Sequence, residues 1–316
     1  MKRLIFTMLA LMIAGISTAA RLDLSANETA NCYMVSGGEK YSFRADVKGN
    51  GVATLGLSAT IDLKAIKGIK IVWEDCDIID DASLKLSGNK ILFATIQGAT
   101  KGNALIGIYS DAACSEGKCI WTWHIWLNKP ADCQIGSFTF LDRNLGAYST
   151  KLGEPGTNGC FWQWGRKEPF TAALEGIQVC RGEKKSFDFA IANPTTFIAR
   201  NGRWMDIDAE EAWRKQGRKT MLDPCPPGYC VPVYDDIVKL KTMGVKEGFI
   251  KAGAIWYDLD PSGQRMVGKA GWYWTSMRTP NRQSRSNDFY IWENGIGLIS
   301  QYYNASALSI RPQKIK

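Results

Sequence analysis

The chain has 316 residues, 45% of them hydrophobic, and a formal net charge of +8. This content supports well-formed cores and argues against long disorder, and the length suggests about two domains. The positive charges are spread along the chain without forming a stripe, which argues against nucleic-acid binding and is compatible with anionic surfaces such as acidic glycans.

Residues 1–20 have the pattern of a secretory signal peptide. Lys2 and Arg3 precede an apolar run from Leu4 to Ile16, and small residues follow, as at a cleavage site. No later stretch reaches the ~20 apolar residues of a membrane helix. We therefore expect an exported protein without direct membrane insertion, located in the periplasm, on the cell surface or outside the cell.

Nine cysteines in an exported chain favour disulfide bonds, with at least one thiol left over. Three pairs each close a loop: Cys114 with Cys119, Cys160 with Cys180, and Cys225 with Cys230. A further bond is open to Cys32, Cys76 and Cys133, and the sequence does not fix the connectivity. A metal site is disfavoured because the chain has no Cys-x-x-Cys pair and a single histidine.

Residues 21–130 predict an all-β sandwich domain. Short alternating runs are separated by Gly, Asn and Asp, without an amphipathic helix. The expected strands are residues 40–47, 68–74, 84–98, 103–111 and 119–127. Asn128, Lys129 and Pro130 end the last strand and mark a domain boundary.

Residues 135–316 predict an α+β domain. Residues 206–217 and 233–244 each begin with acidic and end with basic residues before a glycine, which is typical of helices. Strands are expected again from Ala254 onward: residues 254–260, 264–276, 287–293, 297–303 and 307–312.

Five phrases of the second half resemble, in order, the Fibrobacter-type major paralogous domain. They are residues 140–147 (FLDRNLGA), 159–170 (GCFWQWGRKEPF), 222–240 (LDPCPPGYCVPVYDDIVKL), 271–276 (GWYWTS) and 307–312 (ALSIRP). The resemblance covers about residues 135–316. It implies a C-type lectin-like fold in an exported bacterial surface protein, and the first half resembles the β-sandwich that often precedes this domain.

In relatives of this fold, which include modules at pilus tips and proteins diversified by retroelements, the C-terminal hairpin and nearby loops display the binding residues. This sequence departs from the family at Cys230, where a basic residue is usual, which suggests an extra local disulfide. Residues 295–307 are also less rich in Asn than in diversified relatives, which argues against active diversification.

The stretch 270–295 predicts the ligand-binding hairpin. Alternation places Trp272 and Trp274 on one face and Tyr273 on the other, and turns Phe289 and Ile291 inward. The intervening loop is cationic, and Arg, Tyr, Trp and Asn are favoured at binding surfaces. We predict a ligand surface made of Arg278, Asn281, Arg282, Asn287, Tyr290, Trp292, Tyr302 and Tyr303.

Catalysis and metal binding have weaker support in the sequence. The only histidine, His124, lies in a first-half strand far from any candidate nucleophile, which favours a structural role. Cys225 and Cys230 have the spacing of the copper-binding cysteines in formylglycine-generating enzymes, but their flanking sequence does not match. Near the hairpin, Asp288 and Glu293 are too few acids for calcium. A second acidic pair, Glu168 and Glu175, is too isolated for glycosidase chemistry.

We therefore expect a non-enzymatic binding protein without a cofactor, of the adhesin or pilus-associated type. Its partner would be a glycan or protein on another surface, with pilus subunits as further candidates. The first domain would serve for attachment and the second for receptor binding. The alternatives are an oxidase of the formylglycine-generating type and a structural matrix protein without a specific ligand.

Export predicts cleavage after Ala19 or Ala20 and the formation of disulfide bonds, because an oxidising compartment favours them. Intact-mass analysis of the exported protein, combined with thiol counting, measures both. A mass that retains Met1, or nine free thiols, would contradict this expectation.

Overall fold

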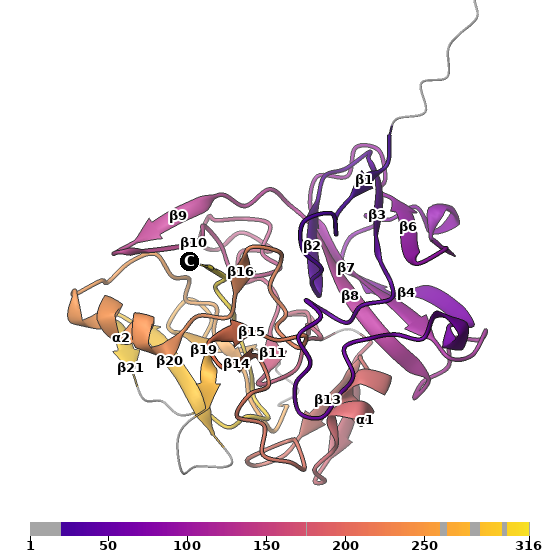
Figure 1. Ribbon diagram of the computed structural model, residues 1–316. Helices are drawn as coiled ribbons and strands as arrows, with labels where there is room; N and C mark the ends of the chain where they lie inside the picture. The colour runs from indigo at the N-terminus through magenta and orange to yellow at the C-terminus, as the bar shows by residue number, and fades with distance from the viewer. Residues whose placement is uncertain (1–19, 175, 260–263, 279–284, 299–301, 316) are drawn as a thin grey trace, which may run out of the picture.

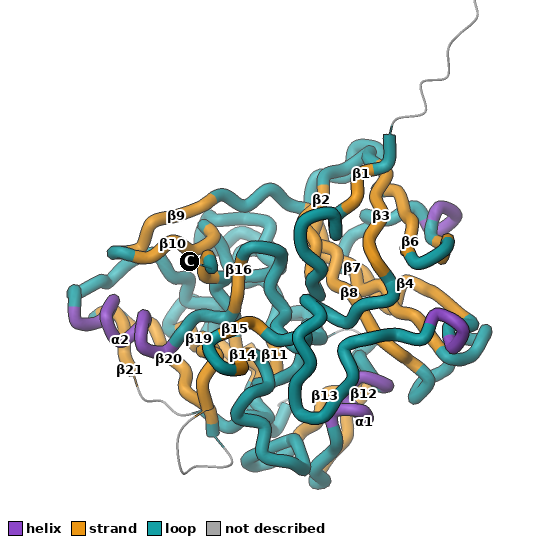
Figure 2. The backbone as a smooth tube through the Cα atoms, in the orientation of Figure 1, coloured by secondary structure: helices purple, strands orange, loops and turns teal. Residues whose placement is uncertain are grey.

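The computed structural model describes residues 20–174, 176–259, 264–278, 285–298 and 302–315. The expected signal peptide thus lies outside the described residues, apart from Ala20. Figures 1 and 2 show a chain built mainly of strands and long loops, with short helices. Within the described part of the chain, no helix is both long and apolar enough to cross a bilayer.

Residues 22–127 form two four-stranded sheets that face each other (Figure 1). The first has the order β1-β3-β6-β5, with bounds Leu22–Asp23, Lys40–Arg44, Lys90–Ala94 and Lys85–Ser87. The second has the order β2-β8-β7-β4, with bounds Cys32–Val35, Cys119–Leu127, Gly102–Tyr109 and Gly68–Glu74. Their loops contain the 3-10 turns η1 (Leu63–Ala65) and η2 (Asp81–Ser83). The strands expected at 68–74 and 119–127 are confirmed.

Aromatic side chains fill the space between these two sheets. The Phe43 ring on β3 lies 5.0 Å from the Tyr33 ring on β2 and 5.1 Å from the Trp123 ring on β8, between centroids. All three side chains are buried. Two sheets that bury their inner faces against each other form the arrangement expected of a β-sandwich.

Strand β8 is buried on both of its faces. Trp123 points toward the first sheet, whereas its neighbours point toward the second half of the chain. There, the His124 ring lies 6.4 Å from the Trp162 ring, and Trp126 Nε1 donates to the carbonyl of Ala147 at 3.0 Å. A strand covered on both sides needs no alternating polar positions. This explains why β8 has a nearly continuous apolar sequence.

Residues 132–314 form the other sheets. One has the order β16-β23-β10-β9, with bounds Tyr229–Cys230, Gln313–Lys314, Phe138–Leu141 and Asp132–Ile135. Another has the order β11-β22-β17-β18, with bounds Trp162–Gln163, Ala307–Leu308, Ala254–Ile255 and Gln264–Arg265. The third is antiparallel and consists of β19 (Gly271–Arg278), β20 (Ser286–Trp292) and β21 (Gly295–Leu298). Two strand pairs complete the set: β12 (Gln178–Arg181) with β13 (Thr196–Ala199), and β14 (Arg214–Lys215) with β15 (Arg218–Lys219).

The two halves share one hydrophobic core although their sheets are separate. The largest cluster contains Trp123 and Trp126 from the first half together with Trp162, Trp164 and Trp274 from the second. No strand pairing within the described chain joins the halves. The boundary expected near residue 130 therefore separates sheets but not cores.

One of the two expected helices is confirmed and the other is wrong. Residues 233–244 contain α2 (Tyr234–Thr242), with acidic residues in its first turn and Ile237 and Leu240 buried. Residues 206–217 instead lead into the hairpin β14–β15. Its turn residues, Gln216 and Gly217, have φ angles of 47° and 78°, and two successive left-handed residues fit the tight turn of a β-hairpin.

A buried tryptophan fixes the segment in which a helix was expected at residues 206–217. Trp213 is fully buried and donates through Nε1 to the carbonyl of Arg166 at 3.0 Å, while Ile207 is exposed. The Trp213 side chain thus anchors this segment to the turn at Arg166, next to the hairpin β14–β15. Tertiary packing overrides a pattern that rested only on the charges at the two ends.

A buried charged cluster, consisting of Arg166, Lys167 and Glu168, lies where the halves meet. Lys167 Nζ is 2.6 Å from one Glu168 carboxylate oxygen, and Arg166 Nε is 3.6 Å from the other, with all three side chains at most 1% exposed. Lys167 Nζ also donates to Thr122 Oγ1 at 2.5 Å and lies 4.2 Å from the centroid of the Trp121 ring. The charged cluster thus ties a turn of the second half to β8.

Arg166 also holds α1 (Phe187–Ala192), a helix that the sequence did not indicate. Its guanidinium donates to the carbonyl of Thr196 at 2.6 Å and to that of Ala190, in the last turn of α1, at 3.3 Å. A cation at this end of a helix satisfies carbonyls that have no partner within the helix. At the other end, Ser186 provides the N-cap.

Replacing Glu168 by glutamine should lower the free energy of unfolding by ~3–5 kcal/mol, because two buried cations lose their counter-charge. Burial alone raises the pKa of the Glu168 carboxyl, but the charges of Lys167 and Arg166 outweigh it and lower the pKa. The stabilisation by the ionised carboxylate is therefore present above the ordinary value of 4.5 and is lost as the pH falls below it.

Denaturant unfolding at several pH values measures both effects, and the gap between wild type and Glu168→Gln should narrow below pH 4.5. Glu154→Gln is the control. Its carboxylate is 3.4 Å from Lys151 Nζ at an exposed position, so the change should stay within about 0.5 kcal/mol. Equal costs for the two variants would show that the charged cluster does not hold the halves together.

Candidate ligand-binding surface

The hairpin β19–β20 is covered on both faces by the body of the second half. Trp272 pairs with Tyr290 across the strands, and Tyr273 pairs with Phe289. The Tyr273 and Phe289 rings are stacked 5.0 Å apart in a second hydrophobic cluster, whereas Trp272 and Trp274 belong to the main one. The predicted alternation of faces is confirmed, and neither face is free along its whole length.

Two predicted site residues on β20 remain accessible to different degrees. Trp292, at the end of β20, is 41% exposed. Tyr290 is half-buried, and its ring lies over Gly297 of β21 so closely that a Cβ there would sit 2.0 Å from the ring. The absence of a side chain at Gly297 thus allows the ring to take this position.

Asn287 was predicted to lie at the surface, but the structure buries it. The residue is only 8% exposed, and its carbonyl accepts a hydrogen bond from Thr275 Oγ1 at 2.7 Å. Ser286 and Asp288 beside it are also buried, so the start of β20 lies inside the fold. Single-strand alternation cannot reveal this, because a strand end can be covered by segments distant in sequence.

Three further predicted residues belong to the loop of the hairpin. Asn281 and Arg282 lie outside the described residues. Arg278 is described only through its backbone, as the last residue of β19. Their assignment to the ligand surface therefore stays a prediction.

Tyr302 and Tyr303 lie beside the hairpin in a set of rings and guanidinium groups. This aromatic–arginine cluster consists of Trp256, Tyr257, Arg265, Trp272, Arg285, Tyr302 and Tyr303. The N–H of Tyr302 donates to Asp288 Oδ1 at 2.9 Å, which fixes the backbone at this point. Burial, with Asp288 nearby, raises the pKa of Tyr302, so its hydroxyl stays protonated.

Each arginine of the aromatic–arginine cluster lies over a ring. Arg265 is 4.3 Å from the centroid of Trp256, and Arg285 is 4.5 Å from that of Tyr303. Arg285 also donates to the Tyr303 hydroxyl at 3.2 Å. Cation–π contacts of this kind are worth about 0.5–1 kcal/mol at exposed sites, so they hold the half-buried side chains in one arrangement.

The sequence did not point to Trp256, Tyr257 or Arg265 as part of this surface. Trp256 and Tyr257 fall in the strand that the sequence predicts at residues 254–260. They join the site because β17, which precedes them, pairs with β22 next to the C-terminal segment. A doublet of aromatic residues just after a short strand was the available signal.

The other candidate sites of the sequence concern metal binding and acid catalysis. No group of three potential His, Cys, Asp or Glu ligands occurs among the described residues. Burial raises the pKa of Cys230 to about 12 and that of Cys225 further, which disfavours the thiolates that copper requires. Glu168 belongs to the charged cluster, and Glu175 lies outside the described residues.

All nine cysteines have free thiols in the structure, so the predicted pairs are not formed in it. Cys114 and Cys119 both pack against Tyr109 in one small apolar cluster. In contrast, Cys160 is fully buried against Gly146, while Cys180 lies on β12 and is half-buried. The first pair has compatible surroundings, whereas the members of the second pair lie in different environments.

Comparison with protein-family models, with curated proteins and with solved structures finds no match to this chain. The resemblance to the Fibrobacter-type major paralogous domain stays a prediction.

Truncation of Trp274 should lower the stability of the protein much more than truncation of Trp292. Trp274 is fully buried and its Nε1 donates to the carbonyl of Trp162 at 2.6 Å, so Trp274→Ala should cost ~3–5 kcal/mol of stability. Trp292→Ala removes an exposed ring, and such changes usually stay within about 0.5 kcal/mol. Melting curves of both variants test this, and early melting of Trp292→Ala would mean that this ring serves packing.

Proposed function

We propose that the protein is an exported, adhesin-type surface protein that binds a glycan or a protein on another surface. Its second half would have a C-type lectin-like fold and present the binding surface. The aromatic–arginine cluster carries this proposal, together with Trp292 at the end of β20, the strand that pairs with Trp272 of the cluster on β19.

The chemistry of this cluster suits recognition of another surface. Tyrosine, tryptophan and arginine dominate binding energy at interfaces because each buries a large, stiff surface and offers hydrogen bonds. Here the rings of Tyr302 and Tyr303 and the guanidinium of Arg285 are partly exposed and already fixed by mutual contacts. A surface ordered before binding loses less conformational entropy when a ligand arrives.

The positions of the resembling phrases support the proposed fold. Trp162 of the second phrase pairs with Leu308 of the fifth, and its carbonyl accepts from Trp274 of the fourth. In the first phrase, the N–H of Leu145 donates to the carbonyl of Ile310, in the fifth, at 2.9 Å. Four phrases far apart in the sequence thus meet in one core, as expected if they are the positions on which a common fold depends.

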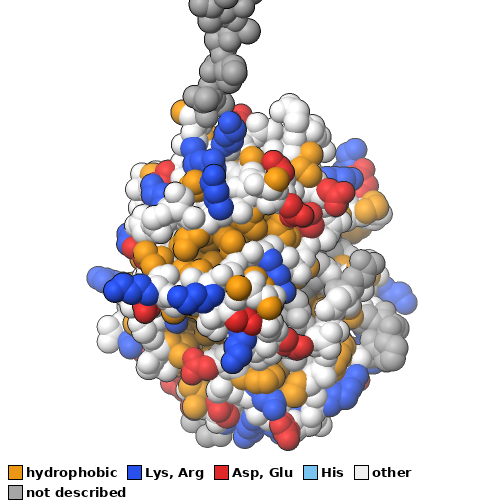
Figure 3. All heavy atoms as spheres, turned by 90° about the vertical axis from the view of Figure 1, so that its right-hand side faces the viewer, with side chains coloured by type: hydrophobic (Ala, Val, Ile, Leu, Met, Phe, Trp, Pro, Cys, Tyr) orange, Lys and Arg blue, Asp and Glu red, His pale blue; other side chains and the backbone are white. Residues whose placement is uncertain are grey.

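An attachment role for the first half is supported by the side of the molecule shown in Figure 3. Hydrophobic side chains form a band across this face. On or beside the edge strands of the two sheets, β4 and β5, the half-buried apolar residues include Ile69, Ile71, Leu84 and Leu86. Edge strands with accessible apolar side chains favour pairing with another chain. Pilus subunits or other surface proteins are the partners we propose for this edge.

Truncation of Arg285 or Trp292 should weaken binding to the receptor surface by ~2 kcal/mol or more each, as for anchor residues of interfaces. The mature protein, Arg285→Ala and Trp292→Ala are compared on glycan arrays and on cells, with melting curves alongside. Met243→Ala is the control, because Met243 is exposed at the end of α2 and outside the aromatic–arginine cluster. If both variants bind as well as wild type, the receptor surface lies elsewhere.

The oxidase alternative gives a separate readout. Under the proposed function, purified protein consumes no oxygen with a thiol peptide, with or without added copper, because the pKa values of Cys225 and Cys230 are raised by burial. Oxygen consumption that is lost in Cys225→Ser would overturn the proposal in favour of the oxidase.

A further inference from the structure

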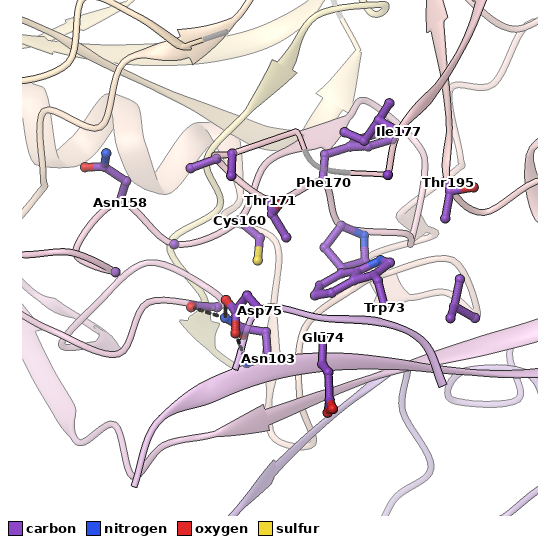
Figure 4. A pocket seen from close by; sticks show the side chains of 18 of the residues that line it. Trp73, Glu74, Asp75, Asn103, Asn158, Cys160, Phe170, Thr171, Ile177 and Thr195 are labelled. Carbon is purple, nitrogen blue, oxygen red and sulfur yellow. Dashed lines mark hydrogen bonds between the residues drawn. The ribbon is translucent and has the colours of Figure 1, made fainter. Parts of the chain in front are cut away.

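A cleft of about 520 Å³ lies between the two halves, away from the aromatic–arginine cluster (Figure 4). β4 and β7 of the first half form one wall, and residues between Gly146 and Ala173, together with Gly176 and Ile177, form most of the other. This volume falls in the range of about 300–1,000 Å³ that is usual for small-molecule sites.

A bulge in β4 turns an aromatic side chain into the cleft. Ile71 pairs with Ile106, but Trp73 pairs with Leu105, so the register shifts by one residue between them. Trp73 therefore shares the face of Leu105 and its neighbour His124 on β8, toward the second half. Without the bulge it would point between the two sheets of the first half. Bulges at sheet edges often re-aim a side chain in this way next to a site.

After the bulge, alternation brings Asp75 to the cleft and turns the Glu74 side chain away, as Figure 4 shows. The Asp75 carboxylate accepts hydrogen bonds from the backbone N–H of Asn103 at 2.6 Å and from its Nδ2 at 2.8 Å. Glu74 instead accepts from the N–H of Ile78, at 3.3 Å. One carboxylate is thus fixed in the cleft.

His124 is the support behind this carboxylate. Asn103 Nδ2 also donates to the carbonyl of Gly146 at 2.9 Å, which leaves its Oδ1 as the acceptor facing His124 Nε2 at 2.9 Å. Burial lowers the pKa of His124 to about 3, so the ring is neutral and carries its proton on Nε2. His124, Asn103 and Asp75 all belong to the first half. Their chain of hydrogen bonds fixes the Asp75 carboxylate where the first half faces the second.

The rest of the lining offers rings and neutral polar groups. Phe170 and Tyr148 join Trp73 as apolar walls, and Tyr148 packs against Gly156, where a Cβ would sit 1.9 Å from its ring. The hydroxyls of Thr171 and Thr195 make no hydrogen bond to any part of the chain that the structure describes. These hydroxyls remain available to a ligand.

We propose that this cleft is a second binding site, which takes a neutral saccharide of about one or two sugar units. A sugar ring presents apolar C–H faces that pack on aromatic rings, and hydroxyls that both donate and accept. Asp75 accepts from such hydroxyls, while Thr171 and Thr195 can donate or accept. The residues match this pattern on both counts.

Other ligand classes fit less well. An anion would meet the Asp75 carboxylate. A cation would find one carboxylate that already accepts two hydrogen bonds, with the ammonium of Lys101 nearby at 5.4 Å from the Tyr148 ring. Covalent capture is disfavoured as well, because burial raises the pKa of the Cys160 thiol at the floor of the cleft well above its usual range.

Saturation-transfer NMR and tryptophan fluorescence on the full mature chain test the proposal. The probes are glucose, galactose, mannose, N-acetylglucosamine, lactose, maltose and cellobiose at millimolar concentration. We expect saturable binding of at least one of them. Trp73→Ala should weaken it about tenfold, through loss of the stacking surface. Thr195→Val should weaken it about three- to tenfold through loss of one hydrogen bond.

Thr195→Val keeps the shape of a side chain that makes no hydrogen bond to the residues that the structure describes, so its melting temperature should equal that of wild type. Glu116→Gln is the control, because Glu116 is exposed on the first half and does not line the cleft, so the change should leave sugar binding unchanged. Absence of saturable binding for every probe, or equal affinity in wild type, Trp73→Ala and Thr195→Val, would overturn the proposal. Trp292→Ala separates the two sites: it should leave sugar binding in the cleft intact even where receptor binding is lost.

Discussion

The buried charged cluster of Arg166, Lys167 and Glu168 joins the two halves of this protein through Lys167, which contacts β8. A charge in a dry interior is tolerated only when it is paired and hydrogen-bonded, and the geometry that satisfies it is narrow. Lys167 satisfies this requirement at β8 and Arg166 at the end of α1. Sliding of one half against the other would break the contacts of Lys167 with Thr122 and Trp121. The relative position of the halves is therefore fixed more sharply than apolar packing alone would fix it.

The cleft depends on this constraint. Trp73 and Asp75 come from the first half, while Tyr148 and Phe170 come from the second. Such a site has a defined shape only if the two walls do not shift. The same hydrogen-bonded chain that orients Asp75 crosses the boundary through Asn103 and Gly146. The contact between the halves therefore forms part of the hydrophobic core and also both walls of the cleft.

Local signals in the sequence were sufficient for the elements that local physics decides. β4, β8 and α2 appear where runs of apolar residues or helix end signals predicted them. The hairpin at 214–219 was missed because its turn residues were hidden by a helix-like order of charges. The bulge after Ile71, the burial of Asn287 and the whole cleft depend on contacts between distant segments. The pattern of residues within one segment does not indicate which distant segments it will contact.

The predicted hairpin shows how a correct pattern can imply an incomplete surface. Alternation assigned Tyr273, Phe289 and Ile291 to one face correctly, and it expected Tyr290 and Trp292 on the other face to point outward. The Trp272 face is covered by the main core. Among the described residues here, Met277 and Trp292 are exposed, and Tyr290, Tyr302 and Tyr303 are half-buried. Packing against the core holds a strand pair buried in this way in place. A ligand surface at its margin would therefore be rigid even without a rigid loop.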